Sequence, residues 1–132
     1  LSMTSVREAA AVFDLTELGV SGFRDCTDDD ICLVGENCPR LVSLGVGGCT
    51  SLTAAALAEV ARLLPRIERV TLHGLKRLTL DDVERFVTSC DLLATVHLDD
   101  CAQIVPVEGW RAILQKAAEA TVPGRILKFE IW

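Results

Sequence analysis

Apolar residues recur along this chain at a constant interval of 26 residues. The first column of the pattern holds Leu15, Leu41, Ile67 and Leu93. Two further columns, three and five residues later, hold Leu18, Leu44, Val70 and Val96, and then Val20, Val46, Leu72 and Leu98. Repetition at a fixed period of this length is typical of a solenoid, in which each repeat buries its apolar face against its neighbours. A repeat array mainly presents a surface, so the period favours binding over catalysis.

The last two apolar positions of each repeat alternate with polar or small residues, which is typical of a short strand with one buried face. A helix-compatible run follows over residues 28–38, 54–64 and 80–90, each directly after a threonine. An acid three residues after the threonine comes close to a capping box in two repeats, and a proline ends the helix in two. These residues are Thr27 with Asp30, Thr79 with Asp82, Pro39 and Pro65.

No repeat can bury its apolar face alone, so the repeats must stack and their strands must form a parallel sheet. We therefore predict a single curved α/β solenoid over residues 1–132, with parallel strands on the concave face and helices on the convex face. The predicted divisions are a partial repeat at 1–14, repeats at 15–40, 41–66, 67–92 and 93–125, and a terminal strand at 126–132.

The two ends of the array depart from the regular pattern. Residues 5–13 read as the helix of an incomplete repeat. In the fourth repeat, Val105 and Pro106 replace the threonine and the helix start, which displaces the predicted helix to about 108–120. We expect Trp110, Ile113 and Leu114 to point inward from that helix. Ile126, Phe129 and Ile131 then repeat the strand pattern.

The repeat resembles the cysteine-containing leucine-rich repeat, which is best known from the substrate-recognition arms of F-box proteins. The consensus L-x-x-L-x-L-x-x-C-x-x-(I/L)-T is matched in the second repeat by Leu41, Leu44, Val46, Cys49, Leu52 and Thr53. The first repeat supplies the closing motif Cys38-Pro39-Arg40-Leu41. Phe23 and Leu75 depart from the pattern, since they stand where the family prefers cysteine. The resemblance implies a leucine-rich-repeat fold and protein binding.

Composition narrows the classes of function. Half of the 132 residues are apolar, which suits a solenoid with one continuous core. The formal net charge of −6 argues against nucleic acid as the main partner, because phosphate binding needs a basic patch. No apolar run is long enough to span a membrane, and no secretory signal is visible. We expect the partners to be other proteins.

Six cysteines raise the question of disulfides or zinc, but the repeat explains them more simply. Cys49 and Cys101 share a column two repeats apart, about 10 Å at the strand spacing of a sheet, which is too far to bridge. No C-x-x-C motif occurs, which argues against zinc. We therefore predict reduced, packed thiols and a reducing intracellular compartment, such as cytoplasm, nucleus or an organelle matrix. Cys26 and Cys32 fit the repeat least well and are expected to be the most exposed.

Outward-facing residues line up in columns across the predicted concave face. From the first strand to the fifth, the columns read Glu17, Ser43, Arg69, Thr95 and Lys128; Gly19, Gly45, Thr71, His97 and Glu130; and Ser21, Gly47, His73, Asp99 and Trp132. The first two repeats are nearly bare, whereas the later ones form a mixed polar patch with one aromatic anchor. The predicted partner-binding residues are Arg69, Thr71, His73, Thr95, His97, Asp99, Lys128 and Trp132. The alternative is that contacts use the helices or the open ends.

Two features look like ligand-binding or catalytic motifs but fit simpler roles. A column of Gly22, Gly48, Gly74 and Asp100 lies where each strand turns away, and it indicates a backbone demand such as positive φ rather than a phosphate loop. His73 and Asp99 should be strand neighbours within hydrogen-bond reach, but an open sheet lacks the water-excluding pocket that catalysis favours. We predict no enzyme activity, no catalytic residues, no cofactor and no metal.

The function that these patterns favour is a non-catalytic protein-protein interaction scaffold, as a subunit or fragment of a larger complex. The alternative is the substrate-recognition arm of an F-box type ubiquitin ligase, which the resemblance implies. The open ends of the array should be capped by further repeats or by a partner, since exposed strand edges are pairing hazards.

Overall fold

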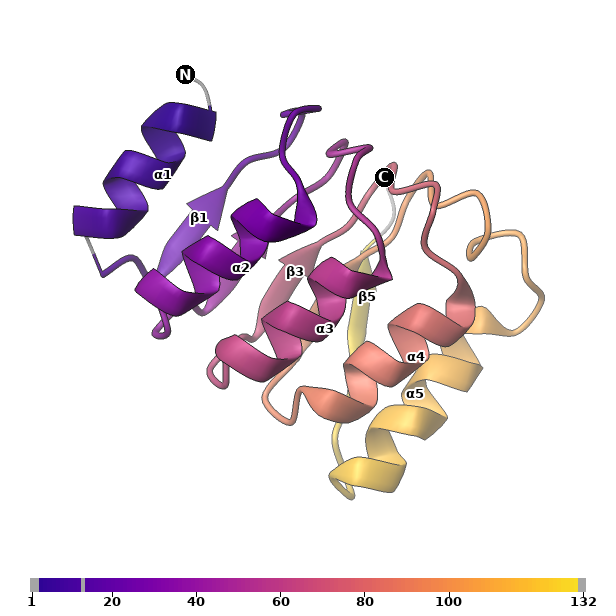
Figure 1. The fold of residues 1–132 in the computed structure, drawn as a ribbon. Helices are drawn as coiled ribbons and strands as arrows, with labels where there is room; N and C mark the ends of the chain where they lie inside the picture. The colour runs from indigo at the N-terminus through magenta and orange to yellow at the C-terminus, as the bar shows by residue number, and fades with distance from the viewer. Residues whose placement is uncertain (1–2, 13, 131–132) are drawn as a thin grey trace.

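A computed structural model gives the fold and describes residues 3–12 and 14–130. In this part of the chain a helix comes first and strands and helices then alternate (Figure 1). The elements are α1 Met3–Val12, β1 Glu17–Gly19, α2 Asp28–Asn37, β2 Ser43–Gly45, α3 Ala54–Leu63, β3 Arg69–Thr71, α4 Leu80–Ser89, β4 Thr95–His97, α5 Trp110–Thr121 and β5 Lys128–Glu130.

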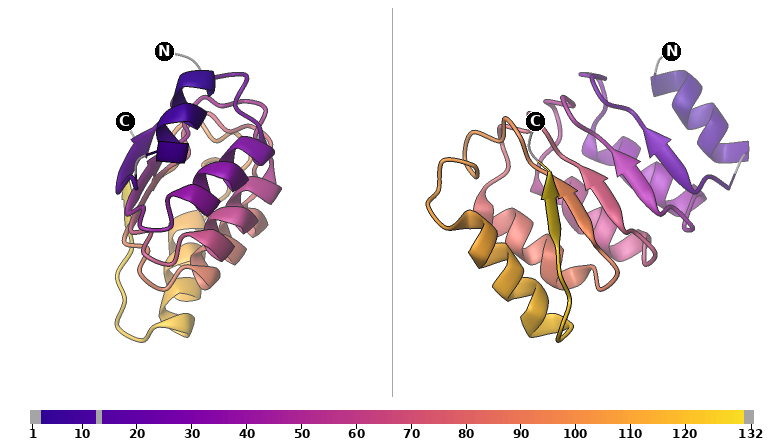
Figure 2. Two further views of the ribbon diagram at one scale, coloured as in Figure 1. Left: turned by 60° about the vertical axis from the view of Figure 1, so that its left-hand side comes forward. Right: turned by 180° about the vertical axis from the view of Figure 1, so that it is seen from behind.

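The strands form one parallel sheet in the order β1-β2-β3-β4-β5. Its register pairs Glu17 with Ser43, Ser43 with Arg69, Arg69 with Thr95, and Thr95 with Lys128. The helices cover one face of this sheet and leave the other open, as Figure 2 shows. The predicted α/β solenoid is confirmed. We call the open side the strand face.

A single apolar layer fills the space between the sheet and the helices. The three predicted columns supply it, and from the second repeat onward their members are at most 4% exposed: Leu41, Ile67, Leu93, Leu44, Val70, Val96, Val46, Leu72 and Leu98. Leu15 and Leu18 are only half-buried, because β1 has a neighbouring strand on one side alone within the described residues. The core is therefore continuous along the array and thins at its first strand.

Threonine caps begin three of the helices. Asp30 N donates a hydrogen bond to Thr27 Oγ1 over 3.4 Å, and Thr27 N donates one to Asp30 Oδ2 over 2.9 Å. Thr79 and Asp82 form the same reciprocal pair at 3.3 and 2.9 Å. Both predicted capping boxes are thus confirmed, and each stabilises the first turn of its helix.

The cap of α3 is completed by the preceding repeat. Thr53 has alanine three residues later, so its own helix offers no capping acid. Asp28 of α2 replaces it by accepting hydrogen bonds from Thr53 N at 2.9 Å and Thr53 Oγ1 at 2.6 Å. This contact ties two repeats together through a helix start.

The last repeat corrects two predictions. Its helix begins at Trp110 rather than near residue 108, and Ile113 is 37% exposed instead of pointing inward. The buried stripe of this helix is formed by Trp110, Leu114 and Ala118, which are four residues apart. Ile113, which precedes Leu114, therefore lies at the edge of the buried face.

The buried residue that opens the terminal strand pattern is also corrected. Ile126 is 79% exposed, and Leu127, at 6%, takes the buried position that opens each repeat. The cause is Gln115 on α5, whose Nε2 donates to Arg125 O over 2.7 Å and whose Oε1 accepts from Leu127 N over 2.9 Å. Phe129 pairs with Val96 as predicted, and Ile131 lies outside the described residues.

An ion pair attaches the first helix to the array. Arg7 Nε on α1 lies 2.6 Å from Asp30 Oδ1, and Asp30 is only 6% exposed. The hydrogen bond from Arg7 outweighs burial and holds the pKa of Asp30 below its ordinary value of 3.8. Because the folded pKa is the lower one, the stabilisation is present above about pH 4 and is lost as pH falls through that folded pKa.

We expect Asp30→Asn to lower the free energy of unfolding by about 1–3 kcal/mol at pH 7, because it removes the charged acceptor of buried hydrogen bonds. The deficit should shrink as pH falls well below 4. Urea denaturation at pH 7 and at pH 3 measures both values. The exposed neighbour Asp29 is the matched control, and equal effects of Asp29→Asn and Asp30→Asn would contradict the role of the ion pair.

Candidate functional site on the strand face

The strand face gathers the predicted partner-binding residues from three strands and the turns after them. Arg69 and Thr71 lie on β3, Thr95 and His97 on β4, and Lys128 on β5, while His73 and Asp99 follow β3 and β4. The register pairs Arg69 with Thr95 and Thr95 with Lys128. It likewise pairs Thr71 with His97 and His97 with Glu130, as the predicted columns require. Trp132, the predicted aromatic anchor, lies outside the described residues.

Charged groups cluster at the β4–β5 end of this face. Lys128 Nζ lies 3.2 Å from Glu130 Oε1. His97 Nε2 lies 3.8 Å from Glu130 Oε2 and 4.0 Å from Asp99 Oδ1, distances that give charge attraction when the imidazole is protonated but no hydrogen bond. His97 is only 5% exposed, so it lies beneath the surface of the strand face. Glu130 was absent from the predicted set, although its place in the His97 column could have indicated it.

Among the described residues no hydrogen bond joins His73 to Asp99, which the sequence placed within hydrogen-bond reach as strand neighbours. His73 Nδ1 and Asp99 Oδ1 are both buried and have no hydrogen-bond partner among the described residues. The His73 ring instead lies over Gly47, where an added Cβ would come within 2.1 Å of His73 Cε1. The second repeat is therefore less bare than predicted, because a side chain of the third repeat covers its backbone.

Arg69 is the exposed cation at the centre of the face. It borders a shallow hollow of about 220 Å³, formed by residues at and just before the starts of β1 to β4. The hollow is lined by Glu17, Val42, Ser43, Glu68, Arg69, Ala94 and Thr95. No ion pair of Arg69 occurs within residues 3–12 and 14–130, so its guanidinium is available to an acidic group of a partner.

The glycine column predicted positive φ at one position in the turn after each strand, and the structure has it. The column has left-handed φ values throughout: 86° at Gly22, 75° at Gly48, 71° at Gly74 and 58° at Asp100. Glycine adopts this region without steric cost, and aspartate is among the few other residues that tolerate it. The column thus serves to turn the chain at the same point of every repeat.

Two solved structures share this arrangement of strands and helices. The tropomodulin C-terminal domain of Caenorhabditis elegans superposes with a TM-score of 0.72 at 15% identity, covering 100% of this chain and 83% of that one. The leucine-rich repeat-containing protein LegL7 of Legionella pneumophila gives 0.62 at 13% identity, covering 99% of this chain and 43% of LegL7. The fold is a leucine-rich-repeat solenoid. No protein-family model and no curated protein matches the chain.

Cysteine has a definite structural role in this leucine-rich-repeat array. The Cys49 thiol donates to Val20 O and the Cys101 thiol to Leu72 O, each over 3.1 Å. Each acceptor directly follows the strand of the preceding repeat. Cys26 is fully buried, which contradicts its predicted exposure, whereas Cys32 is partly exposed. A small buried donor at one fixed position explains the recurrence of cysteine in this column.

Three of the buried thiols, those of Cys26, Cys90 and Cys101, have the chemistry of structural residues. Burial raises the pKa of Cys90 to about 12 and also raises that of Cys101. A hydrogen bond with Cys49, together with burial, raises the pKa of Cys26. A thiol that stays protonated at neutral pH is a poor nucleophile and metal ligand.

Across residues 3–12 and 14–130, the side chains of His, Cys, Asp and Glu form no group of three or more arranged to hold a metal ion. None of the helices there has the length and apolar character needed to cross a membrane.

Proposed function

We propose that this chain is a non-catalytic protein-protein interaction scaffold, a subunit or fragment of a larger complex, and that a partner protein binds its strand face. The observation that carries the proposal is the uncovered face of the parallel sheet, with exposed Arg69 beside a shallow hollow. Side chains held on adjacent strands have fixed spacing, which suits recognition of another surface. Net charge of −6 makes nucleic acid an unfavourable main partner.

A catalytic role is the less favourable explanation of the same residues. His97 is nearly inaccessible, and His73 packs on Gly47 rather than activating a nucleophile. The described hollow on the strand face is shallow and open, whereas catalysis favours a water-excluding pocket. A reducing intracellular compartment is part of the proposal, because free buried thiols such as Cys49 and Cys101 persist there.

A second candidate is the substrate-recognition arm of an F-box type ubiquitin ligase. It is favoured by the cysteine column, in which Cys49 and Cys101 make equivalent hydrogen bonds two repeats apart. Affinity purification at native abundance with mass spectrometry separates the two. Stoichiometric recovery of one assembly without a cullin-ligase adaptor supports the scaffold, and recovery of an adaptor supports the ligase arm.

The strand-face proposal predicts that Arg69→Glu weakens partner binding about 5- to 30-fold, as loss of an arginine hot spot of 1–2 kcal/mol would. Quantitative recovery of the partner measures this effect. The control is Arg85→Glu on α4, which makes the same charge change on the helix side and should leave recovery unchanged. Circular dichroism verifies that both variants are folded. Loss of binding in the Arg85 variant alone would move the contact to the helices.

A further inference from the structure

Cys26 occupies a position that leucine or isoleucine holds in the other repeats. The equivalent residues at the repeat spacing are Leu52, Leu78 and Ile104. Each of them is at most 2% exposed, and Cys26 is fully buried in the same apolar layer. Core packing therefore explains an apolar side chain at this position, but it does not explain why the first repeat has a thiol there.

The thiol of Cys26 meets a second thiol, which comes from the next repeat. Cys26 forms a side-chain hydrogen bond with Cys49, and both residues are fully buried. Cys49 Sγ itself donates to Val20 O over 3.1 Å, so Cys26 is the donor and Cys49 the acceptor of the bond between the two thiols. Two cysteines from adjacent repeats thus lie side by side in the core.

Cys101 shows how the same position behaves without a second thiol. It shares the column of Cys49, it is fully buried, and its thiol makes the equivalent hydrogen bond to Leu72 O over 3.1 Å. The residue in the place of Cys26 is here Leu78. Burial raises the pKa of Cys101, whereas the hydrogen bond from Cys26 lowers the pKa of Cys49. The neighbouring thiol therefore favours the thiolate of Cys49, which is the reactive form of cysteine.

We infer that Cys26 and Cys49 form a site of reversible oxidation, at which a peroxide converts the two thiols into a disulfide between the first and second repeats. The Cys49 thiolate attacks one peroxide oxygen and becomes a sulfenic acid. The second oxygen leaves as hydroxide and takes up the proton that Cys49 released. The Cys26 sulfur then attacks the sulfenic sulfur, and its proton leaves with the hydroxyl group as water. The two thiols thus give two electrons to one peroxide, and a dithiol reductant reverses the change.

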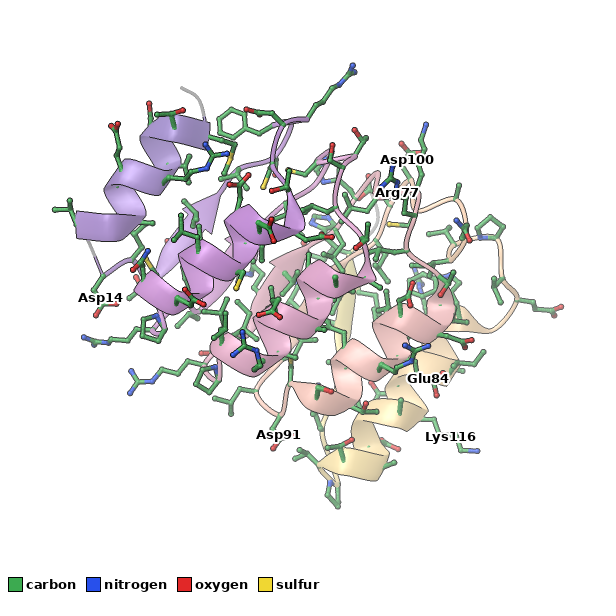
Figure 3. All side chains as sticks on the ribbon, in the orientation of Figure 1. Asp14, Arg77, Glu84, Asp91, Asp100 and Lys116 are labelled. Atoms are coloured by element: carbon green, nitrogen blue, oxygen red, sulfur yellow. The ribbon has the colours of Figure 1, made fainter. Side chains whose placement is uncertain are left out.

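The buried pair lies next to an exposed turn of the chain. Residues 21–25 follow β1 at the edge of the array where Arg77 and Asp100 mark the equivalent turns (Figure 3). All of these residues except half-buried Phe23 are exposed, and they directly precede Cys26. A local opening of this turn, which leaves the sheet intact, is sufficient to expose the Cys26 thiol to a molecule as small as peroxide.

Peroxide treatment of the Cys32→Ser variant tests the inference. All six cysteines lie in the described part of the chain, and Cys32 is the one that is not buried. The reduced protein is treated with hydrogen peroxide, free thiols are blocked with N-ethylmaleimide, and peptides are mapped by mass spectrometry without reduction. A linked pair of peptides containing Cys26 and Cys49 should exceed every other cysteine pair about tenfold or more, and dithiothreitol should remove the link. In concentrated urea this preference should disappear.

Two substitutions determine whether the neighbouring thiol is responsible. Cys26→Leu introduces the residue of the later repeats, so sulfenic acid at Cys49, trapped with dimedone, should form about tenfold more slowly and at the rate of Cys101. Leu78→Cys places the same partner beside Cys101 and should produce a second disulfide. Circular dichroism verifies that both variants are folded.

Two results would overturn the inference. Absence of the link between Cys26 and Cys49 at every peroxide concentration that leaves the fold intact would show that the two thiols do not form a disulfide site. Equal reactivity of Cys49 with and without Cys26→Leu would show that the neighbouring thiol does not activate it. Neither result affects the Arg69→Glu experiment, so this inference and the strand-face proposal fail separately.

Discussion

Replacing Leu72 or Leu44 by alanine is expected to lower the free energy of unfolding by about 2–5 kcal/mol each. Both side chains lie between sheet and helices, with Leu72 fully buried and Leu44 1% exposed. Truncation removes apolar area from the core and leaves a cavity that short strands on either side cannot close. Guanidinium denaturation, followed by far-ultraviolet circular dichroism, measures the change.

The matched control is Ile126→Ala at the exposed position beside the terminal strand. Ile126 is 79% exposed, so this substitution should change stability by no more than about 0.5 kcal/mol. Near-neutral behaviour of Leu44→Ala and Leu72→Ala would contradict the register of the array. A large loss at Ile126 would restore the sequence-based assignment of Ile126 to the buried position before the last strand.

Trp110→Ala should lower the free energy of unfolding by about 3–5 kcal/mol. The indole is 7% exposed and packs edge-on against Phe129, with ring centroids 5.3 Å apart and planes at 77°. This contact joins the start of α5 to β5, so its loss should also speed amide exchange in the last strand before the rest of the sheet. Denaturation and hydrogen exchange measure the two effects.

Two variants determine whether the buried ring itself is responsible. Trp110→Phe retains an aromatic contact and should lose much less stability than Trp110→Ala. Arg111 lies over the indole, with its guanidinium carbon 5.2 Å from the ring centroid, and Arg111→Ala should cost only about 0.5–1 kcal/mol. Equal losses for Trp110→Ala and Arg111→Ala would contradict a structural role for the α5–β5 contact.

Features that repeat with the period could be predicted from the sequence. Each column of apolar residues needs only a constant spacing and a buried face, and both are local properties of the chain. The two capping boxes could be predicted for the same reason, because their partners lie within one helical turn: Thr27 with Asp30, and Thr79 with Asp82. The left-handed turn position is likewise marked by glycine in three of the four repeats.

Features set by contacts between separate elements could not be predicted. Ile126 fits the apolar pattern better than Leu127 does, but Gln115 fixes the turn by side-chain hydrogen bonds from another element. His73 turns toward Gly47 because glycine leaves room for the ring, a preference that no spacing reveals. In each case the deciding partner lies outside the local segment, and the segment by itself allows another arrangement.

Photo-crosslinking determines directly whether a partner protein contacts the strand face. A photoreactive amino acid replaces Thr71 at the centre of the sheet in one sample and Ala58, exposed on α3, in another. Irradiation of the native complex should link a partner protein to position 71 and not to position 58. Crosslinking from position 58 alone, with both variants folded and in the complex, would contradict binding of the partner at the strand face.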